Sequence, residues 1–258
     1  MTGKRIWFHF KAVCNGWIFA SVNLFLYLVR PAPSSPTLSD SEITVVLTCC
    51  DRNQFLEKTL KSFLEFNTYK HLKFLIIEDG ENRGSFDICK KYLDNKYEWQ
   101  YIFNERNLGQ LASIDLAYGQ CFSKYVFHLE EDWQFVAPGF IEESLYYLNK
   151  YPKCLFVSLR KFDDQNNHPV KPSGICNNML TFTAFWKGCW TGFGFNASLR
   201  RMADYKKLKN GYSYKNIREI GPGIFYKLLG FEILVFHDKK FLNHLGENAS
   251  TAATHKKA

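Results

Sequence analysis

The chain has 258 residues, a formal net charge of +8 and an aromatic content of 17%, with 24 Phe and 14 Tyr. Its length and aromatic content suit a domain with a substantial buried core and exclude an intrinsically disordered chain. The positive charge is compatible with anionic lipid, nucleic acid or phosphorylated small substrates. No basic run is interleaved with aromatic residues, so we expect no nucleic-acid partner.

The N-terminal segment predicts a membrane anchor. Residues 12–29 carry no charge and follow three basic residues. A run of this length is at the short end of what crosses a bilayer, and basic residues before it favour a cytoplasmic N-terminus. We therefore expect a cytoplasmic tail (1–11), an uncut signal-anchor helix (12–29) and a Pro- and Ser-rich stem (30–42). The chain would be a single-pass type II membrane protein, luminal in the Golgi or ER if its host is eukaryotic; a cleaved signal peptide and a buried helix are the alternatives.

Strands and helices are predicted to alternate after residue 42. Short apolar runs typical of buried strands occupy residues 43–48, 72–77, 99–103 and 125–129. Segments typical of helices lie at 53–64, with Asn53 as a candidate cap, and at 85–93 and 108–122. Repeated βα units predict an α/β fold with a doubly wound, mostly parallel sheet in a domain over residues 43–258.

Polar residues follow each of these strands. They are Asp51 and Arg52, then Asp79, then Asn107, and finally the triplet Glu130, Glu131 and Asp132. Each group has an ordinary explanation as a cap or turn. Ligands of such sheets bind beyond the carboxyl ends of the strands, and core packing does not require four polar ends. We expect Asp51, Asp79 and Asp132 to surround one cavity open to solvent.

The acidic triplet has two interpretations. Adjacent carboxylates repel one another, so they either face water as a solvated turn or share a cation. Mg²⁺ and Mn²⁺ are commonly held by one or two protein carboxylates together with substrate phosphates. A divalent cation is therefore a candidate cofactor.

Four sequence motifs, in their order along the chain, resemble the nucleotide-sugar half of a GT-A-fold glycosyltransferase of the large family 2. The phrases that carry the resemblance are TVVLTCCDRNQFLEKTLKSFLE, FLIIEDG, NERNLGQLASIDLAYG and VFHLEEDWQF. The chain is also similar to the N-acetylglucosaminyltransferase I group in Cys50-Asp51-Arg52, Glu130-Glu131-Asp132 and Ala137-Pro138-Gly139-Phe140. The likeness runs from about residue 43 to residue 250 and is specific in motif order rather than in residue identity.

The resemblance implies roles for the polar strand ends. Asp51, Arg52 and Asp79 would line the nucleotide pocket together with Asn107. Asp132 would bind the metal, and Glu131 would contact the ribose or a metal-bound water. Glu130 stands where the family usually has Asp, which leaves the number of direct metal contacts open, and metal-independent variants of the fold exist.

The second half supplies candidates for the acceptor side. Residues 154–160 are predicted to form a fifth strand, and the polar residues 161–172 after it a loop able to meet substrate. Residues 182–195 alternate aromatic and small residues. Trp186 and Trp190 could lie against a sugar ring, or these aromatics could simply fill the core.

The resemblance also implies a general base and a further metal or diphosphate ligand. Glu219 precedes a predicted helix, as the family's base does, whereas Asp163 and Asp164 lie nearer the base of the N-acetylglucosaminyltransferase I group. A solvated helix cap is the alternative for Glu219. His244, expected beyond the final strands, would complete the metal site or bind the diphosphate.

The expected function is therefore a metal-dependent glycosyltransferase, a hexosyl- or N-acetylhexosaminyl-transferase. It would move a sugar from a UDP- or GDP-linked donor to a glycan or glycoconjugate hydroxyl, with inversion, using Mn²⁺ or Mg²⁺. Two alternatives are a nucleotide-sugar- or glycan-binding protein without turnover and a basic, membrane-tethered interaction protein.

Overall fold

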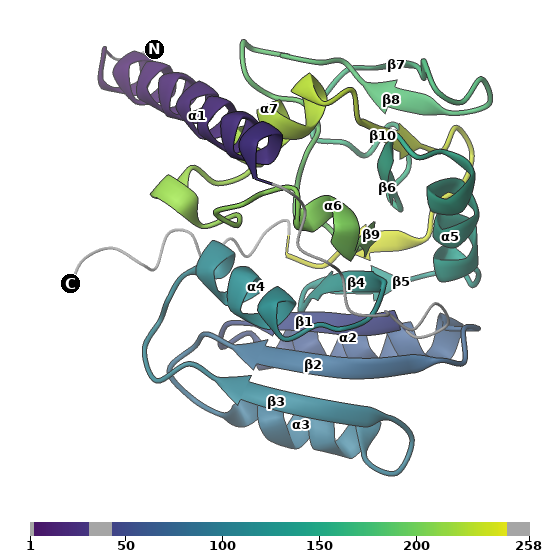
Figure 1. Cartoon of the computed structure of the whole chain (residues 1–258). Coiled ribbons are helices and arrows are strands. Elements are labelled where there is room, and N and C mark those ends of the chain that lie inside the picture. Colours follow the sequence, from purple (N-terminus) through teal and green to yellow (C-terminus); the bar gives the residue numbers. More distant parts are fainter. Residues whose placement is uncertain (1–2, 31–42, 247–258) are drawn as a thin grey trace.

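A computed structural model describes residues 3–30 and 43–246 (Figure 1). Residues 31–42 of the predicted stem and residues 247–258 of the predicted domain lie outside the described residues.

A five-stranded sheet forms the centre of the fold. Its order is β3 (Glu98–Phe103), β2 (Leu72–Glu78), β1 (Ile43–Cys49), β4 (Tyr125–Glu130) and β9 (Ser198–Arg201). The first four are parallel, and β9 pairs antiparallel with β4. The predicted α/β fold with a mostly parallel sheet is confirmed.

Helices cover both faces of this sheet (Figure 1). α2 (Asn53–Phe66) and α3 (Gly84–Leu93) lie on one face, and α4 (Gln110–Gly119) lies on the other. Every residue of β1 is buried, because Val45 and Leu47 pack into the α2 side while Val46 packs into the α4 side. Strands buried on both faces are typical of parallel sheets covered by helices.

Two helix starts differ from the sequence prediction. Arg52 takes the N-cap position of α2 without a side-chain cap bond, so the prediction that Asn53 caps this helix is wrong. α4 begins at Gln110 instead of residue 108, because Gly109 before it has φ of +84°, outside the helical region.

The second half builds two smaller sheets. One has the order β6 (Cys154–Ser158), β10 (Glu232–Val235), β8 (Leu180–Phe182) and β7 (Val170–Pro172), so the predicted fifth strand lies outside the central sheet. In the other, β5 (Trp133–Phe135) pairs with β11 (Leu242–His244). His244 pairs with Trp133 inside β11, which corrects the expectation that it lies beyond the final strand.

Helices and a 3₁₀ turn complete the second half. α5 (Phe140–Lys150) follows β5, and α6 (Met202–Tyr205) follows β9. The turn η1 (Tyr214–Asn216) leads to α7 (Ile220–Leu228), before which Glu219 stands at the N-cap position.

One continuous helix, α1 (Gly3–Val29), forms the described N-terminal part. Its segment Phe10–Val29 is long and apolar enough to cross a membrane by length and composition, which is weak evidence for an anchor. The helix includes most of the predicted tail and lies beside α7 (Figure 1).

Candidate active site

The carboxyl ends of the parallel strands bring the predicted polar residues to one edge. The strands end nearly level, since Cys49 pairs with Glu78, Glu78 with Phe103 and Thr48 with Glu130. A cavity of about 290 Å³, here called the strand-end cavity, opens at this edge. Its lining includes Arg52, Asp79, Asn107, Glu130 and Glu131.

Asp79 shapes the loop that enters α4. Its carboxylate accepts hydrogen bonds from the backbone N–H groups of Leu108 (2.7 Å) and Gly109 (2.8 Å) and from Asn104 Nδ2 (2.7 Å). Asn107 Nδ2 donates to the Asp79 carbonyl over 2.8 Å. A buried carboxylate with three donors holds this wall of the cavity rigid.

Asp51 organises the loop after β2 and does not line the strand-end cavity. Its carboxylate accepts from the backbone N–H groups of Glu81 (2.6 Å) and Asn82 (3.2 Å). A Cβ at Gly80 would lie 2.4 Å from Asp51 Cγ, so the loop passes too close for any larger residue.

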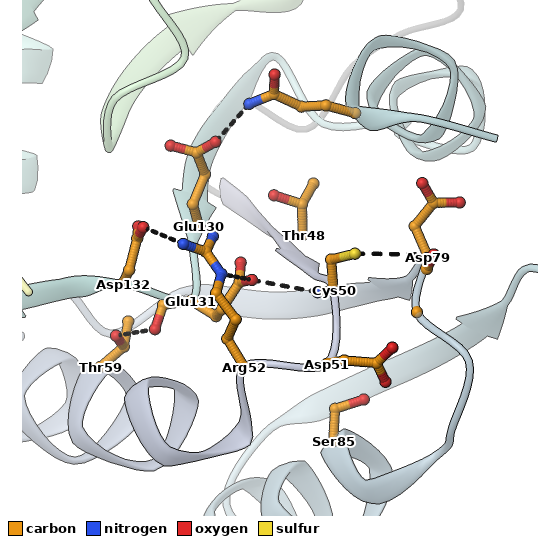
Figure 2. A network of polar contacts seen from close by, with 12 residues as sticks. Thr48, Cys50, Asp51, Arg52, Thr59, Asp79, Ser85, Glu130, Glu131 and Asp132 are labelled. Carbon is orange, nitrogen blue, oxygen red and sulfur yellow. Dashed lines mark hydrogen bonds and ion pairs between the residues drawn. The ribbon is translucent and has the colours of Figure 1, made fainter. Parts of the chain in front are cut away.

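Arg52 joins two carboxylates of the acidic triplet. Its Nε lies 2.7 Å from Glu131 Oε1, and its Nη1 lies 2.6 Å from Asp132 Oδ2. Figure 2 shows Asp51 and Asp79 on the other side of Arg52 from Asp132. The expectation that the three aspartates surround one cavity is therefore wrong, because Arg52 draws Asp132 to itself and Asp51 turns to residues 81–82.

The pKa values of the triplet differ. Burial raises the pKa of Glu130 to about 8, with the neighbouring charges of Asp132 and Glu131 adding to the effect. Burial also raises the pKa of Glu131, although Arg52 opposes it. For Asp132, burial acts to raise the pKa, but the hydrogen bond to His244 and the charge of Arg52 outweigh it and lower the pKa below its usual value.

The two residues predicted to bind the metal, Asp132 and His244, lie next to each other in the structure. His244 Nε2 lies 3.2 Å from Asp132 Oδ2. A Cβ at Gly246 would lie 2.8 Å from the same oxygen, so the chain after β11 closes tightly over Asp132.

Within residues 3–30 and 43–246, no group of three or more His, Cys, Asp or Glu side chains is arranged to hold a metal ion. Asp132 and His244 still offer one oxygen and one nitrogen. Mn²⁺ or Mg²⁺ completed by substrate phosphates and waters needs only one or two protein ligands. The pair fits such a cation provided that Arg52 leaves Oδ2 of Asp132.

A second cavity of about 340 Å³, here called the aromatic cavity, lies in the second half. Its walls include Arg160, His168, Trp186, Trp190 and Glu219. Gly192 also lines it, with φ of +82°, and a Cβ there would lie 2.2 Å from the Phe182 ring, so this position requires glycine.

Glu219 is the base candidate that lines the aromatic cavity. Burial raises its pKa, while the charges of Arg218 and Arg200 oppose the effect. Asp163 pairs with Lys161 and Asp164 pairs with Arg160, at 2.7 and 2.6 Å, and neither lines this cavity. The geometry therefore favours Glu219 over the two aspartates as a base that faces the aromatic cavity.

Trp133 contacts one lining residue of each cavity. Its indole Nε1 donates to Glu130 Oε2 over 3.4 Å, and Glu130 lines the strand-end cavity. The Arg160 guanidinium of the aromatic cavity lies 5.7 Å from the centre of the Trp133 ring. The buried Trp133 indole therefore links lining residues of the two cavities.

Sequence reasoning missed several lining residues. The sequence predicts Gln110, which donates to Glu130 over 2.6 Å, only as part of a helix, and Arg160 only as the end of a strand. The position of Arg160 after a buried strand was the available signal. His168 lies in the polar loop 161–172 that the sequence predicts to meet substrate, and the folded chain brings it to Trp186, with ring centres 4.8 Å apart.

Curated relatives match only parts of this chain. A cholesterol galactosyltransferase of Borreliella burgdorferi is 29% identical over 91 residues, which cover 35% of this chain and 25% of the relative. Glycosyltransferase GlyA of Streptococcus pneumoniae is 29% identical over 97 residues, covering 37% of this chain and 14% of the relative. The chain thus spans a quarter or less of these two relatives.

Solved structures share the fold at low identity. The mannosyltransferase PcManGT from Pyrobaculum calidifontis, in complex with GDP-Man and Mn²⁺, superposes with a TM-score of 0.61 at 12% identity, covering 95% of this chain and 68% of that one. S. aureus TarS 1-349 in complex with UDP-GlcNAc gives 0.56 at 14% identity, covering 80% and 61%.

The family assignment rests on most of the α/β half. Residues 44–208, more than half of the chain, match the family described as Glycosyl transferase family 2. The match includes the four parallel strands and the acidic triplet, while Glu219 and His244 lie beyond it. The chain belongs to glycosyl transferase family 2.

Proposed function

We propose that this protein is a glycosyltransferase that moves a sugar from a UDP- or GDP-linked donor to a hydroxyl of a glycan or glycoconjugate, with inversion. One observation carries the proposal: Trp133 contacts a lining residue of each cavity, Glu130 of the strand-end cavity and Arg160 of the aromatic cavity. The family assignment and the nucleotide-sugar complexes of structural neighbours support the same function. We also propose that α1 attaches the enzyme to a membrane.

The strand-end cavity would hold the nucleotide. Arg52 supplies a positive charge for a diphosphate, and Asn107 and Gln110 supply hydrogen-bond donors. The rigid wall around Asp79 would place the base and ribose. Glu130, with its pKa near 8, is largely neutral at pH 7 and adds little repulsion against phosphate.

Asp132 and His244 would hold Mn²⁺ or Mg²⁺, which supplies positive charge for the diphosphate leaving group. Arg52 already neutralises Asp132 and Glu131. On donor binding it would contribute its charge to the phosphates instead.

Glu219 would act as the general base in the aromatic cavity. Its carboxylate takes the proton of the acceptor hydroxyl, whose oxygen bonds to the anomeric carbon as the bond from that carbon to the diphosphate breaks. A raised pKa brings a carboxylate closer to the range in which a base works best near neutral pH. The indoles of Trp186 and Trp190 offer apolar faces for the acceptor sugar.

A second candidate function is nucleotide-sugar binding without turnover. It is favoured by the ion pairs that Asp132 makes with Arg52 and His244, which leave its Oδ2 atom fully engaged. Such a protein would bind a UDP- or GDP-sugar and release no nucleotide from it.

Nucleotide release distinguishes the two functions. The full chain is incubated with a panel of UDP- and GDP-sugars, with and without Mn²⁺, and free UDP or GDP is measured. A transferase releases nucleotide from at least one donor, and Glu219→Gln reduces the release while the matched control Asp163→Asn does not. Binding without any release in wild-type protein would overturn the transferase proposal.

A further inference from the structure

The N-terminal helix α1 is packed against the globular domain through reciprocal glycine contacts. A Cβ at Gly16 would lie 2.5 Å from Ile220 Cγ2 of α7, and a Cβ at Gly221 of α7 would lie 2.7 Å from Phe19 Cγ. Phe19 and Ala20 are fully buried by these contacts. Two helices that meet at glycines on both sides are closely fitted.

The docked face runs along nearly the whole apolar segment. It is made of residues at helical spacing: Ala12, Val13, Gly16, Phe19, Ala20, Asn23, Leu24 and Tyr27. Asn23 is fully buried, and its polar atoms are satisfied because Nδ2 donates to the Phe19 carbonyl over 3.1 Å and Oδ1 accepts from the Asn210 backbone N–H over 3.3 Å. The asparagine in this apolar segment thus belongs to the contact with the domain.

The opposite face of α1 is apolar and exposed. Phe10, Phe25 and Leu28 are 66%, 63% and 72% exposed, and Ile18 and Val29 are exposed as well. Trp17, at the edge of this face, stacks on Phe185 with ring centres 5.5 Å apart. A row of large apolar residues along about five helical turns is unusual on a surface that faces only water.

Positive charges lie at both ends of the apolar segment of α1 and on two segments that contact this helix. α1 contains no Asp or Glu. Exposed Lys11 and Arg30 lie at either end of its apolar segment, and exposed Lys187 and Lys215 lie on the two segments that contact α1 through Phe185 and Tyr214. Apolar side chains flanked by Trp, Lys and Arg are the pattern of a helix that lies in the interface of an anionic membrane.

Docking and spanning exclude each other in this structure. The docked residues 12–27 extend over ~23 Å of helix at ~1.5 Å per residue, which is most of a hydrocarbon core ~30 Å thick. If α1 crossed a bilayer while docked, the polar segment around Lys215 and Arg218 would enter the hydrocarbon, which is costly for charged groups.

We propose that α1 lies in the plane of an anionic membrane, docked on α7, with its exposed face inserted into one leaflet. This attachment differs from the spanning anchor that the sequence predicts, because both ends of the helix stay on the side of the globular domain. It does not depend on the proposed transferase activity.

Vesicle flotation of the full chain tests the insertion. Wild-type protein is expected to float with phosphatidylcholine vesicles that contain phosphatidylserine, and less with phosphatidylcholine alone. Phe25→Glu/Leu28→Glu should remain at the bottom of the gradient, whereas Phe122→Glu, which changes a side chain of similar exposure (67%) outside α1, should float like wild type. Thermal unfolding checks that both variants are folded. A wild-type protein that does not float, or a folded double variant that floats fully, would overturn the proposal.

Cysteine modification then separates lying in the membrane from crossing it. Lys11→Cys and Arg30→Cys are made separately, and the protein bound to sealed vesicles is treated with an impermeant maleimide carrying polyethylene glycol. If the helix lies in the plane of the membrane, the reagent added outside the vesicles modifies one more cysteine in each variant than in the wild-type protein. Protection of either position until detergent is added would show a spanning helix and contradict the proposal.

Discussion

Arg52 Nη1 lies 2.6 Å from Asp132 Oδ2, in the position that a cation would take beside this carboxylate. The guanidinium also contacts Glu131, so one side chain neutralises two nearly buried acids. The pKa of Asp132 is lowered in spite of burial, which keeps the carboxylate ionised. An ionised carboxylate can bind a metal ion in place of the Arg52 guanidinium. Cation exchange at Asp132 is the step on which donor binding depends in the proposed function.

Arg52→Ala should destabilise the fold, because Glu131 and Asp132 lose the partner of their negative charges. Loss of one partner from a buried ion pair costs about 3–5 kcal/mol, and the partial exposure of Arg52 places the expected loss at the lower end. Urea unfolding measures the change. Mn²⁺ should recover more stability in this variant than in wild type, and unchanged stability without metal would contradict the role given to Arg52.

Glu219→Gln should lower kcat by about 10²–10⁴-fold, the usual contribution of a general base. The wild-type rate should rise with pH through a pKa above the ordinary carboxyl range, because burial raises the pKa of Glu219 and only the ionised form accepts a proton. Initial rates across a pH series check both statements. A Glu219→Gln enzyme with the wild-type rate and pH profile would assign the base elsewhere.

Glu130 should make the fold less stable as the pH rises. Its pKa is raised from 4.5 to about 8 in the folded chain, so its stabilising contribution is complete below pH 4.5 and is lost as the pH rises through about 8. Glu130→Gln cannot ionise and should flatten this part of the pH dependence. Urea unfolding over the same range measures it; equal slopes in the two proteins would show that Glu130 titrates normally.

Gly16→Leu should disrupt the docking of α1, since even a Cβ at this position would meet Ile220 Cγ2 at 2.5 Å. Overpacking of a tight contact costs about 1–3 kcal/mol. Ser21→Leu is the matched control, because Ser21 is exposed on the same helix. Thermal unfolding should show a loss for the first variant and little change for the second; equal melting temperatures would argue against a packed α1.

The sequence was sufficient for the parallel half of the fold. Apolar runs of strand length and their alternation with helical patterns are local signals, so the four parallel strands and the edge that carries Arg52, Asp79 and Glu131 were predicted from residues 43–132. The additional likeness to the N-acetylglucosaminyltransferase I group stays a prediction.

Side-chain partners and helix docking were harder to predict, because they depend on residues far apart in the chain. Asp51 was expected in the donor pocket, but its carboxylate accepts from residues 81 and 82. Gly16 packs closely against Ile220, although most of the sequence lies between their two helices, and no local sequence pattern predicts this contact. The second sheet was missed for a similar reason, since its strands are short and two of its pairings are antiparallel.

The most direct test of the proposed function measures donor binding at Asp132. Melting temperatures of wild type, Asp132→Ala and the control Asp163→Ala are recorded with a panel of UDP- and GDP-sugars, each with and without Mn²⁺. We predict that at least one donor stabilises wild type and the control only when Mn²⁺ is present, and that Asp132→Ala loses this stabilisation. Equal stabilisation of Asp132→Ala and wild type, or no stabilisation of wild type by any donor with Mn²⁺, would contradict the account.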